Sequence, residues 1–160
     1  MDIAAASRTF SKVQEIYLAS MGYAHPHLAK IMNNIGVLRY KEGDFSGATH
    51  AFEIAYEYQC CLVEEHPGNS AAAEIAMGYN LTNIGFLYHE QDELVSAVRL
   101  FEEAWSTLTP HLFADDPKVL MVQHNIEYLG GKGIDKSAPC EEGCQLMPAA
   151  KTSLTALPPN

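Results

Sequence analysis

Lysine and arginine are scarce in this sequence: ten of them stand against twenty aspartates and glutamates, which gives a formal net charge of −10. The scarcity is greatest between Lys41 and Arg99, where ten acidic residues occur and no lysine or arginine does. A surface that binds nucleic acid needs an excess of positive charge, so nucleic acid is excluded as a partner. The acidic stretch has two interpretations: a solvated face that aids solubility, or a negative field that attracts a basic partner.

Long apolar runs are also missing. No stretch approaches the roughly 18 apolar residues that a membrane span needs, so no membrane association is expected. The first residues, "MDIAAASRTFSKVQEIY", lack the basic start and the apolar stretch of a secretory signal, and the expected compartment is therefore the cytoplasm. A chain of 160 residues, 48% of them hydrophobic, suffices for one domain with a buried core.

Patterns that carry chemistry are few. None of the seven histidines forms a pair four residues apart that is backed by a third metal ligand. The cysteines form two pairs, Cys60-Cys61 and Cys140/Cys144, and free thiols are expected in the cytoplasm. Three residues separate Cys140 from Cys144, a spacing that fits neither a redox Cys-x-x-Cys motif nor half of a zinc site. We expect no enzyme activity, metal or cofactor, with a metal or redox role for Cys140 and Cys144 as an alternative.

What the sequence does contain is a repeat. The segment "NNIGVLRYKEGDFSGATHAFEIA" (33–55) recurs as "TNIGFLYHEQDELVSAVRLFEEA" (82–104), at a fixed offset of 49 residues. Partial copies, "FSKV" (10–13) and "HNIEYLG" (124–130), precede and follow at an offset of 42 residues. An insertion of about seven residues reconciles the two offsets. We assign it to "GNSAAAEI" (68–75), which is predicted to add two helical turns capped by Asn69 or Ser70.

Each copy is predicted to be a pair of helices, because apolar residues such as Ile31 and Leu38 recur at helical spacing. The turn of the first copy is assigned to Gly43, a left-handed C-cap, followed by Asp44 as N-cap; Asp92 is the predicted cap in the second copy. The predicted organisation is a domain over 1–129 and a flexible Gly/Pro-rich tail over 130–160. The domain comprises a half unit (2–21), a unit (26–66), a unit (68–111) and a half unit (117–129).

Small residues occupy equivalent places in the two copies. Gly36 and Gly85 lie in the first helix of each pair, where they are predicted to let the two helices approach closely. Phe52 and Phe101 are predicted to fill the gap towards the next pair. One pair cannot bury both of its apolar faces, so the pairs are expected to stack on one another.

These residues resemble a known repeat. The small residue, the short turn and the pattern Ala48, Phe52, Ala55 are similar to the tetratricopeptide repeat. The longer period, the His-Pro of "HPHLAKIMNNIGVL" (25–38) and the paired asparagines resemble the kinesin light chain subtype of that repeat. The resemblance covers about residues 10–129. It implies an all-α fold, a short right-handed α-α solenoid, and a non-catalytic adaptor or scaffold that binds other proteins.

The resemblance further implies a concave groove, lined by the first helices, that takes an extended peptide or a helix. Carboxamides there can bond peptide backbone, and aromatic side chains supply rigid contact area; packing roles for both remain the alternative. The acidic stretch favours a partner with basic residues beside an apolar anchor. The predicted groove residues are Lys30, Asn33, Asn34, Val37, Tyr40, Tyr79, Thr82, Asn83, Phe86, His89, Met121, His124, Asn125 and Tyr128.

A competing hypothesis makes the repeat an assembly surface. Two and a half units leave exposed ends, and the end near Leu112, Phe113, Leu120 and Met121 is then expected to stack on a second chain or on the tail. A homo-oligomer is therefore the second predicted state.

Overall fold

The computed structural model describes residues 26–66, 68 and 70–134, together with five residues near the N-terminus (5, 8, 9, 12 and 16). The predicted half unit 2–21 lies almost wholly outside the described residues. So do the tail beyond residue 134, Cys140 and Cys144.

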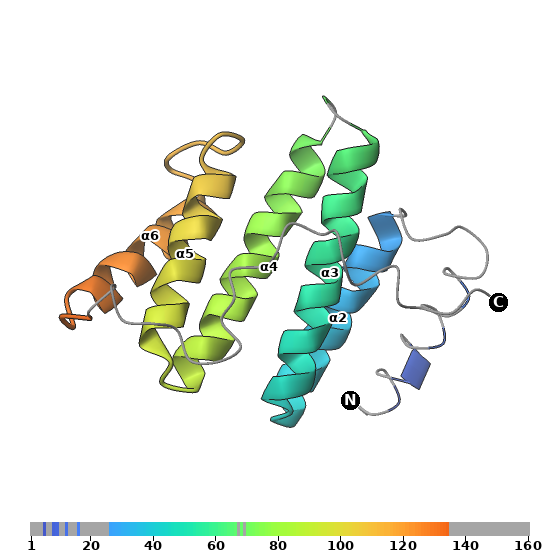
Figure 1. Cartoon of the computed structure of the whole chain (residues 1–160), viewed down its shortest axis with the longest axis horizontal. Coiled ribbons are helices and arrows are strands. Elements are labelled where there is room, and N and C mark those ends of the chain that lie inside the picture. Colours follow the sequence, from blue (N-terminus) through green and yellow to red (C-terminus); the bar gives the residue numbers. More distant parts are fainter. Residues whose placement is uncertain are drawn as a thin grey trace.

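The described residues form helices and no strand, which confirms the all-α class. The helices are α2 (Pro26–Glu42), α3 (Phe45–Glu65), α4 (Ala71–Glu90), α5 (Leu94–Leu108) and α6 (Pro117–Gly130). Each helix packs mainly against the one before it and the one after it in the chain, so the helices form a row in sequence order (Figure 1). Among the described residues, none of the helices combines the length and apolar character that a membrane crossing requires.

Both turns within helix pairs need a residue in the left-handed conformation. Gly43 has φ of +79° and Asp44 accepts a hydrogen bond from the Gly47 amide at 2.9 Å, as predicted. The prediction that Asp92 caps α5 is wrong: Asp92 has φ of +62°, and Glu93 takes the cap position without a side-chain bond. The offset of 49 residues explains this, because it places Asp92 at the position of Gly43, and aspartate tolerates this conformation better than most residues.

The two repeat glycines lie directly against phenylalanine rings. A Cβ atom added at Gly36 would come within 2.6 Å of Phe52 Cε1, and one at Gly85 within 2.9 Å of Phe101 Cε1. The predicted close approach of the helices is therefore confirmed. Each ring covers the glycine of its own pair, and Phe52 also belongs to the core cluster that contains Leu81 of α4, in agreement with its predicted place towards the next pair.

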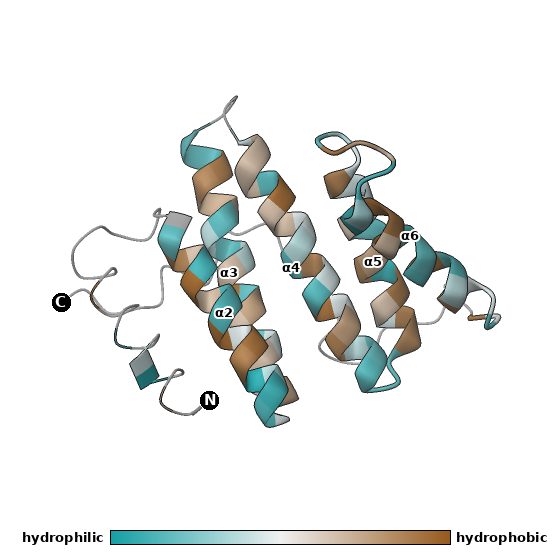
Figure 2. Cartoon of the chain, turned by 180° about the vertical axis from the view of Figure 1, so that it is seen from behind, coloured by the Kyte–Doolittle hydropathy of each residue, from teal (hydrophilic) through white to brown (hydrophobic). Residues whose placement is uncertain are grey.

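Helix α3 contributes to two separate parts of the core. Its residues Ala51, Ala55 and Tyr58 pack with buried residues of α2, whereas Phe52 and Tyr56 belong to the larger cluster that extends to α6. Apolar and polar residues are accordingly interspersed along the helices (Figure 2). This pattern is expected when a helix is covered on more than one side.

A polar cluster fastens the start of α4 to the segment after α5. The Ala-rich insertion forms the first turns of α4, as predicted, but the hydroxyl of Ser70 bonds the Glu74 carboxylate rather than the backbone. The other Glu74 oxygen lies 2.6 Å from Nε2 of His111. The hydrogen bond from Ser70, and then that from His111, lower the pKa of Glu74.

Replacement of Gly36 by alanine is expected to destabilise the fold by roughly 1–2 kcal/mol, because overpacking against the Phe52 ring outweighs the better helix propensity of alanine. Chemical denaturation measures the change. Gly130→Ala is the matched control: its Cβ meets nothing within 4 Å, so this variant should be neutral or slightly more stable. Equal effects of the two substitutions would contradict the close-packing argument.

The polar cluster around Glu74 predicts that the free energy of unfolding decreases at acidic pH. A carboxyl whose folded pKa is lowered stabilises the fold above its unfolded pKa, and this contribution is lost as pH falls through the folded value. Wild type should therefore exceed Glu74→Gln in free energy of unfolding at pH 7, and the gap should narrow below about pH 4.5. Ser70→Ala should lie between the two. A gap that stays constant down to pH 3 would be evidence against the cluster.

Candidate functional site

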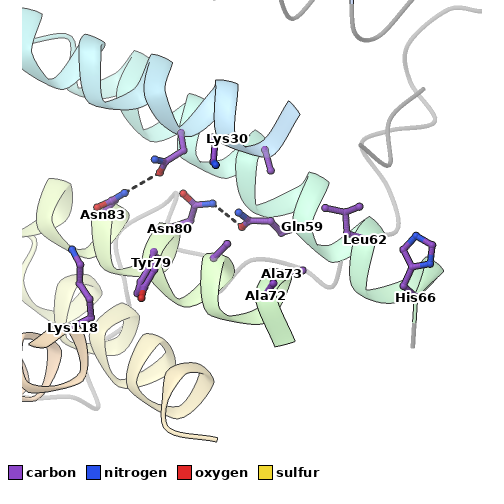
Figure 3. A pocket seen from close by; sticks show the side chains of 13 residues that line it. Lys30, Gln59, Leu62, His66, Ala72, Ala73, Tyr79, Asn80, Asn83 and Lys118 are labelled. Atoms are coloured by element: carbon purple, nitrogen blue, oxygen red, sulfur yellow. Dashed lines mark hydrogen bonds between the residues drawn. The ribbon is translucent and has the colours of Figure 1, made fainter. Parts of the chain in front are cut away.

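The candidate site is a hollow of about 510 Å³ between α2, α3, α4 and α6, here called the large hollow. Its volume lies within the range of small-ligand pockets. Figure 3 shows side chains from the four helices gathered around it. The lining residues are Ala29, Lys30, Asn33, Gln59, Leu62, His66, Ala72, Ala73, Ala76, Tyr79, Asn80, Asn83 and Lys118.

A second hollow of about 200 Å³, the small hollow, adjoins the first at Asn83, which lines both. Its walls are largely aromatic and aliphatic, with one carboxylate at Glu90. Of the predicted groove residues, Lys30, Asn33, Tyr79 and Asn83 line the large hollow. The small hollow is lined by Val37, Tyr40, Phe52, Asn83, Phe86, Leu87 and Glu90.

Several predicted residues line neither hollow. Thr82 is buried, and its hydroxyl donates to the Gly78 carbonyl of its own helix at 2.8 Å. Asn34 and His89 are half-buried outside both hollows. For the residues of α4 the reason is that this helix packs between α3 and α5, so only part of its predicted face stays open.

The predicted α6 residues also lie outside both hollows. Asn125 donates to the Met121 carbonyl at 2.9 Å within α6, and Tyr128 is exposed beneath the ammonium of Lys132, 4.6 Å from its ring centre. His124 is likewise exposed. Lys118, near the start of α6, is the residue that this helix contributes to the large hollow.

Carboxamides in the large hollow bond each other in two pairs. Asn83 Nδ2 donates to Asn33 Oδ1 of α2 at 3.1 Å, and Asn80 Nδ2 donates to Gln59 Oε1 of α3 at 2.7 Å (Figure 3). Asn80 and Asn83 are three residues apart and therefore share one side of α4. Among the predicted groove residues, Asn83 thus lines both hollows and ties α4 to α2, whereas Asn34 and Asn125 line neither hollow.

The lining of the large hollow also includes Gln59 and Leu62 of α3 and His66 just after it, none of which is among the predicted groove residues. The predicted lining residues come only from the first helix of each pair. The alanines of the insertion have small side chains, so α3 stays accessible behind the start of α4. The sequence did contain features that point to Gln59 and Asn80 as lining residues. Gln59 is the one amide in "YEYQCCL" (56–62), and Asn80 lies three residues before Asn83, on the same side of a helix.

The charge in the large hollow is opposite to that of the whole chain. Lys30 and Lys118 line it together with His66, and no acidic residue of the described chain does. The Lys118 ammonium lies 5.6 Å from the centre of the Tyr79 ring, a cation–π contact that holds the lysine at the rim. Burial, and secondarily the charge of Asp116, raises the pKa of the Tyr79 hydroxyl, which therefore stays protonated as a donor.

A third hollow, of about 420 Å³, is polar and lies between α3 and the turn before α5. His50 Nδ1 is 3.9 Å from Glu53 Oε2, and burial raises the pKa of Glu53. Glu93 is a second carboxylate of the lining. In the described part of the chain, no group of three or more histidine, cysteine, aspartate or glutamate side chains is arranged to hold a metal ion.

The cysteines of α3 are half-buried free thiols. Burial raises the pKa of Cys60 to about 11, so this thiol is protonated at neutral pH and is a poor nucleophile. Burial also raises the pKa of the neighbouring Tyr56.

Comparison of the sequence with models of known protein families gives no match, and comparison with curated proteins gives none either.

Proposed function

We propose that the chain is a non-catalytic interaction module, a short right-handed solenoid of tetratricopeptide-like helix pairs similar to those of kinesin light chains. It binds an extended peptide or a helix along the large and small hollows. The repeat at a fixed offset and the row of consecutively packed helices support the fold relationship. The observation that best supports this function is that the large and the small hollow meet at Asn83, which lines both, on one side of the row of helices.

The charges of the two hollows suggest the chemistry of the ligand. A carboxylate is favoured over the large hollow, where Lys30 and Lys118 are the charged groups. An apolar group, with or without a basic neighbour, suits the aromatic small hollow and its Glu90. Of the ten acidic residues between Lys41 and Arg99, only Glu90 lines either of these hollows, and it lines the small one. A purely basic peptide is therefore disfavoured at the large hollow.

Enzymatic roles have less support. A reactive site needs an activated nucleophile or a positioned acid and base, and the described thiols are shifted towards the unreactive form. The cytoplasm is the proposed location.

Neutralising the lysines of the large hollow is expected to weaken peptide binding. Peptides selected on a random array with the wild-type chain should carry an acidic group, and fluorescence polarisation then gives their Kd. Lys30→Gln and Lys118→Gln should each raise Kd by up to about fivefold, the usual worth of an exposed ion pair.

Lys41→Gln is the control, because Lys41 is exposed in the last turn of α2 and lines neither hollow. Rising salt should reduce the difference between wild type and the two hollow variants. Selected peptides without any acidic group, or an unchanged Kd in both hollow variants, would refute the assigned ligand chemistry.

A second candidate function is self-assembly through α6. The last described helix packs chiefly against α5 and exposes Leu120 (49%) and Tyr128 (53%), and the segment before it exposes Phe113 (85%). Exposed apolar side chains on the last helices of a repeat domain favour stacking on a second copy.

Sedimentation equilibrium tests the second candidate. Self-association is expected to increase with protein concentration and to be lost in Leu120→Glu, which places a charge in the proposed interface. Tyr40→Glu is the matched control, since Tyr40 is an exposed apolar residue of α2 (40%). A wild-type chain that remains monomeric across concentrations would exclude this candidate.

A further inference from the structure

We infer that the floor of the large hollow is a subsite for a primary carboxamide, the side chain of an asparagine or glutamine in the bound segment. The subsite is formed by Gln59 of α3 and Asn80 of α4. This inference rests on the proposed function, in which the hollow receives a peptide, and it names one group that the peptide carries.

The two floor residues are polar and almost fully enclosed. Gln59 is 5% exposed and Asn80 is 1% exposed, and both line the large hollow. They come from different helices and meet through a single hydrogen bond of 2.7 Å, from Asn80 Nδ2 to Gln59 Oε1 (Figure 3). Their remaining polar atoms therefore face only protein or the hollow.

One hydrogen bond leaves half of each carboxamide unused. A carboxamide has two N–H donors and one carbonyl acceptor, so Gln59 Nε2 and Asn80 Oδ1 remain. Within the described residues neither atom has a hydrogen-bond partner, and neither is among the enclosed polar atoms cut off from solvent. Both atoms therefore keep some exposure to solvent, and the residues that carry them line the hollow.

The remaining donor and acceptor belong to two carboxamides that are already joined by a hydrogen bond, so a ligand that pairs with both must carry an acceptor and a donor of its own. A primary carboxamide carries its carbonyl and one N–H on the same edge, so the carbonyl accepts from Gln59 while the N–H donates to Asn80. A carboxylate would repel the Asn80 carbonyl oxygen, and an ammonium would leave the Gln59 donor unpaired, which is costly at a buried position. Exchanging the O and N positions of both amides still leaves one donor and one acceptor.

The walls around the floor leave room for such a group. Ala29 of α2 and the alanines 72, 73 and 76 of α4 present only methyl groups to the hollow. The charged residues stand at the rim, where Lys30 and Lys118 are exposed. A peptide in which an acidic residue neighbours an asparagine or glutamine can place its carboxylate at the rim and its carboxamide at the floor.

The test uses small amides as probes and requires no peptide. Acetamide is titrated into the 15N-labelled chain, and the side-chain NH2 signals of Gln59 and Asn80 are followed by NMR. Acetamide is expected to shift both signals saturably. Acetate and N,N-dimethylacetamide, which lack the donor N–H, are expected to leave them unshifted.

Two double variants distinguish loss of the subsite from a general effect on the fold. Gln59→Met with Asn80→Leu replaces both partners by apolar groups of similar size, a change that is close to neutral for stability. This double variant should lose the saturable acetamide response at the neighbouring Tyr79 and Asn83 amides. Gln123→Met with Asn125→Leu, which removes two carboxamides of α6 that line neither hollow, is the control and should retain the response at Gln59 and Asn80.

Two results would overturn the inference. One is the absence of a saturable acetamide shift at Gln59 and Asn80. The other is an equal response to N-methylacetamide, whose N–H and carbonyl point in opposite directions as in a peptide bond; this would assign the floor to main chain. Loss of the lysine effect on peptide binding, with the acetamide response intact, would refute the proposed ligand charge and leave this subsite standing.

Discussion

The contact between a helical glycine and a phenylalanine ring sets the geometry on which the rest of the structure depends. At Gly36 and at Gly85 the space that a Cβ atom would need is filled by the ring of Phe52 or Phe101. The two helices of each pair can therefore approach closely, and the same rings extend the core towards neighbouring helices. Because the contact repeats at a fixed offset, both pairs present α2 and α4 in comparable positions. The large hollow lies between these helices and Lys118 near the start of α6.

The helices and their close approach could be predicted from local patterns. Helical spacing, the glycine of the first turn and the repeat offset each depend on a few neighbouring residues, and these expectations were confirmed in the described region. Asp92 was assigned the wrong role because aspartate is favourable both as a cap and in the left-handed conformation. Only the three-dimensional requirement of the turn decides between the two.

The candidate site was predictable only in part. Lys30, Asn33, Tyr79 and Asn83 line the large hollow because helical spacing fixes one side of α2 and of α4. The contribution of Gln59 depends on which part of α3 the alanine-rich turns leave open, and that is a property of packing between helices. The positive charge of the large hollow was not predictable for a similar reason. The sequence has an excess of acidic residues, but none of those that the structure describes lines this hollow.

Helix α3 belongs to both core clusters, and this has a consequence for cooperativity. Its Ala51, Ala55 and Tyr58 cover α2, while its Phe52 and Tyr56 belong to the cluster that continues to α6. A local opening that detaches α3 would hydrate both clusters at once, whereas fraying of α6 would uncover only the edge of one. We therefore expect the first pair to unfold together with the second rather than independently of it.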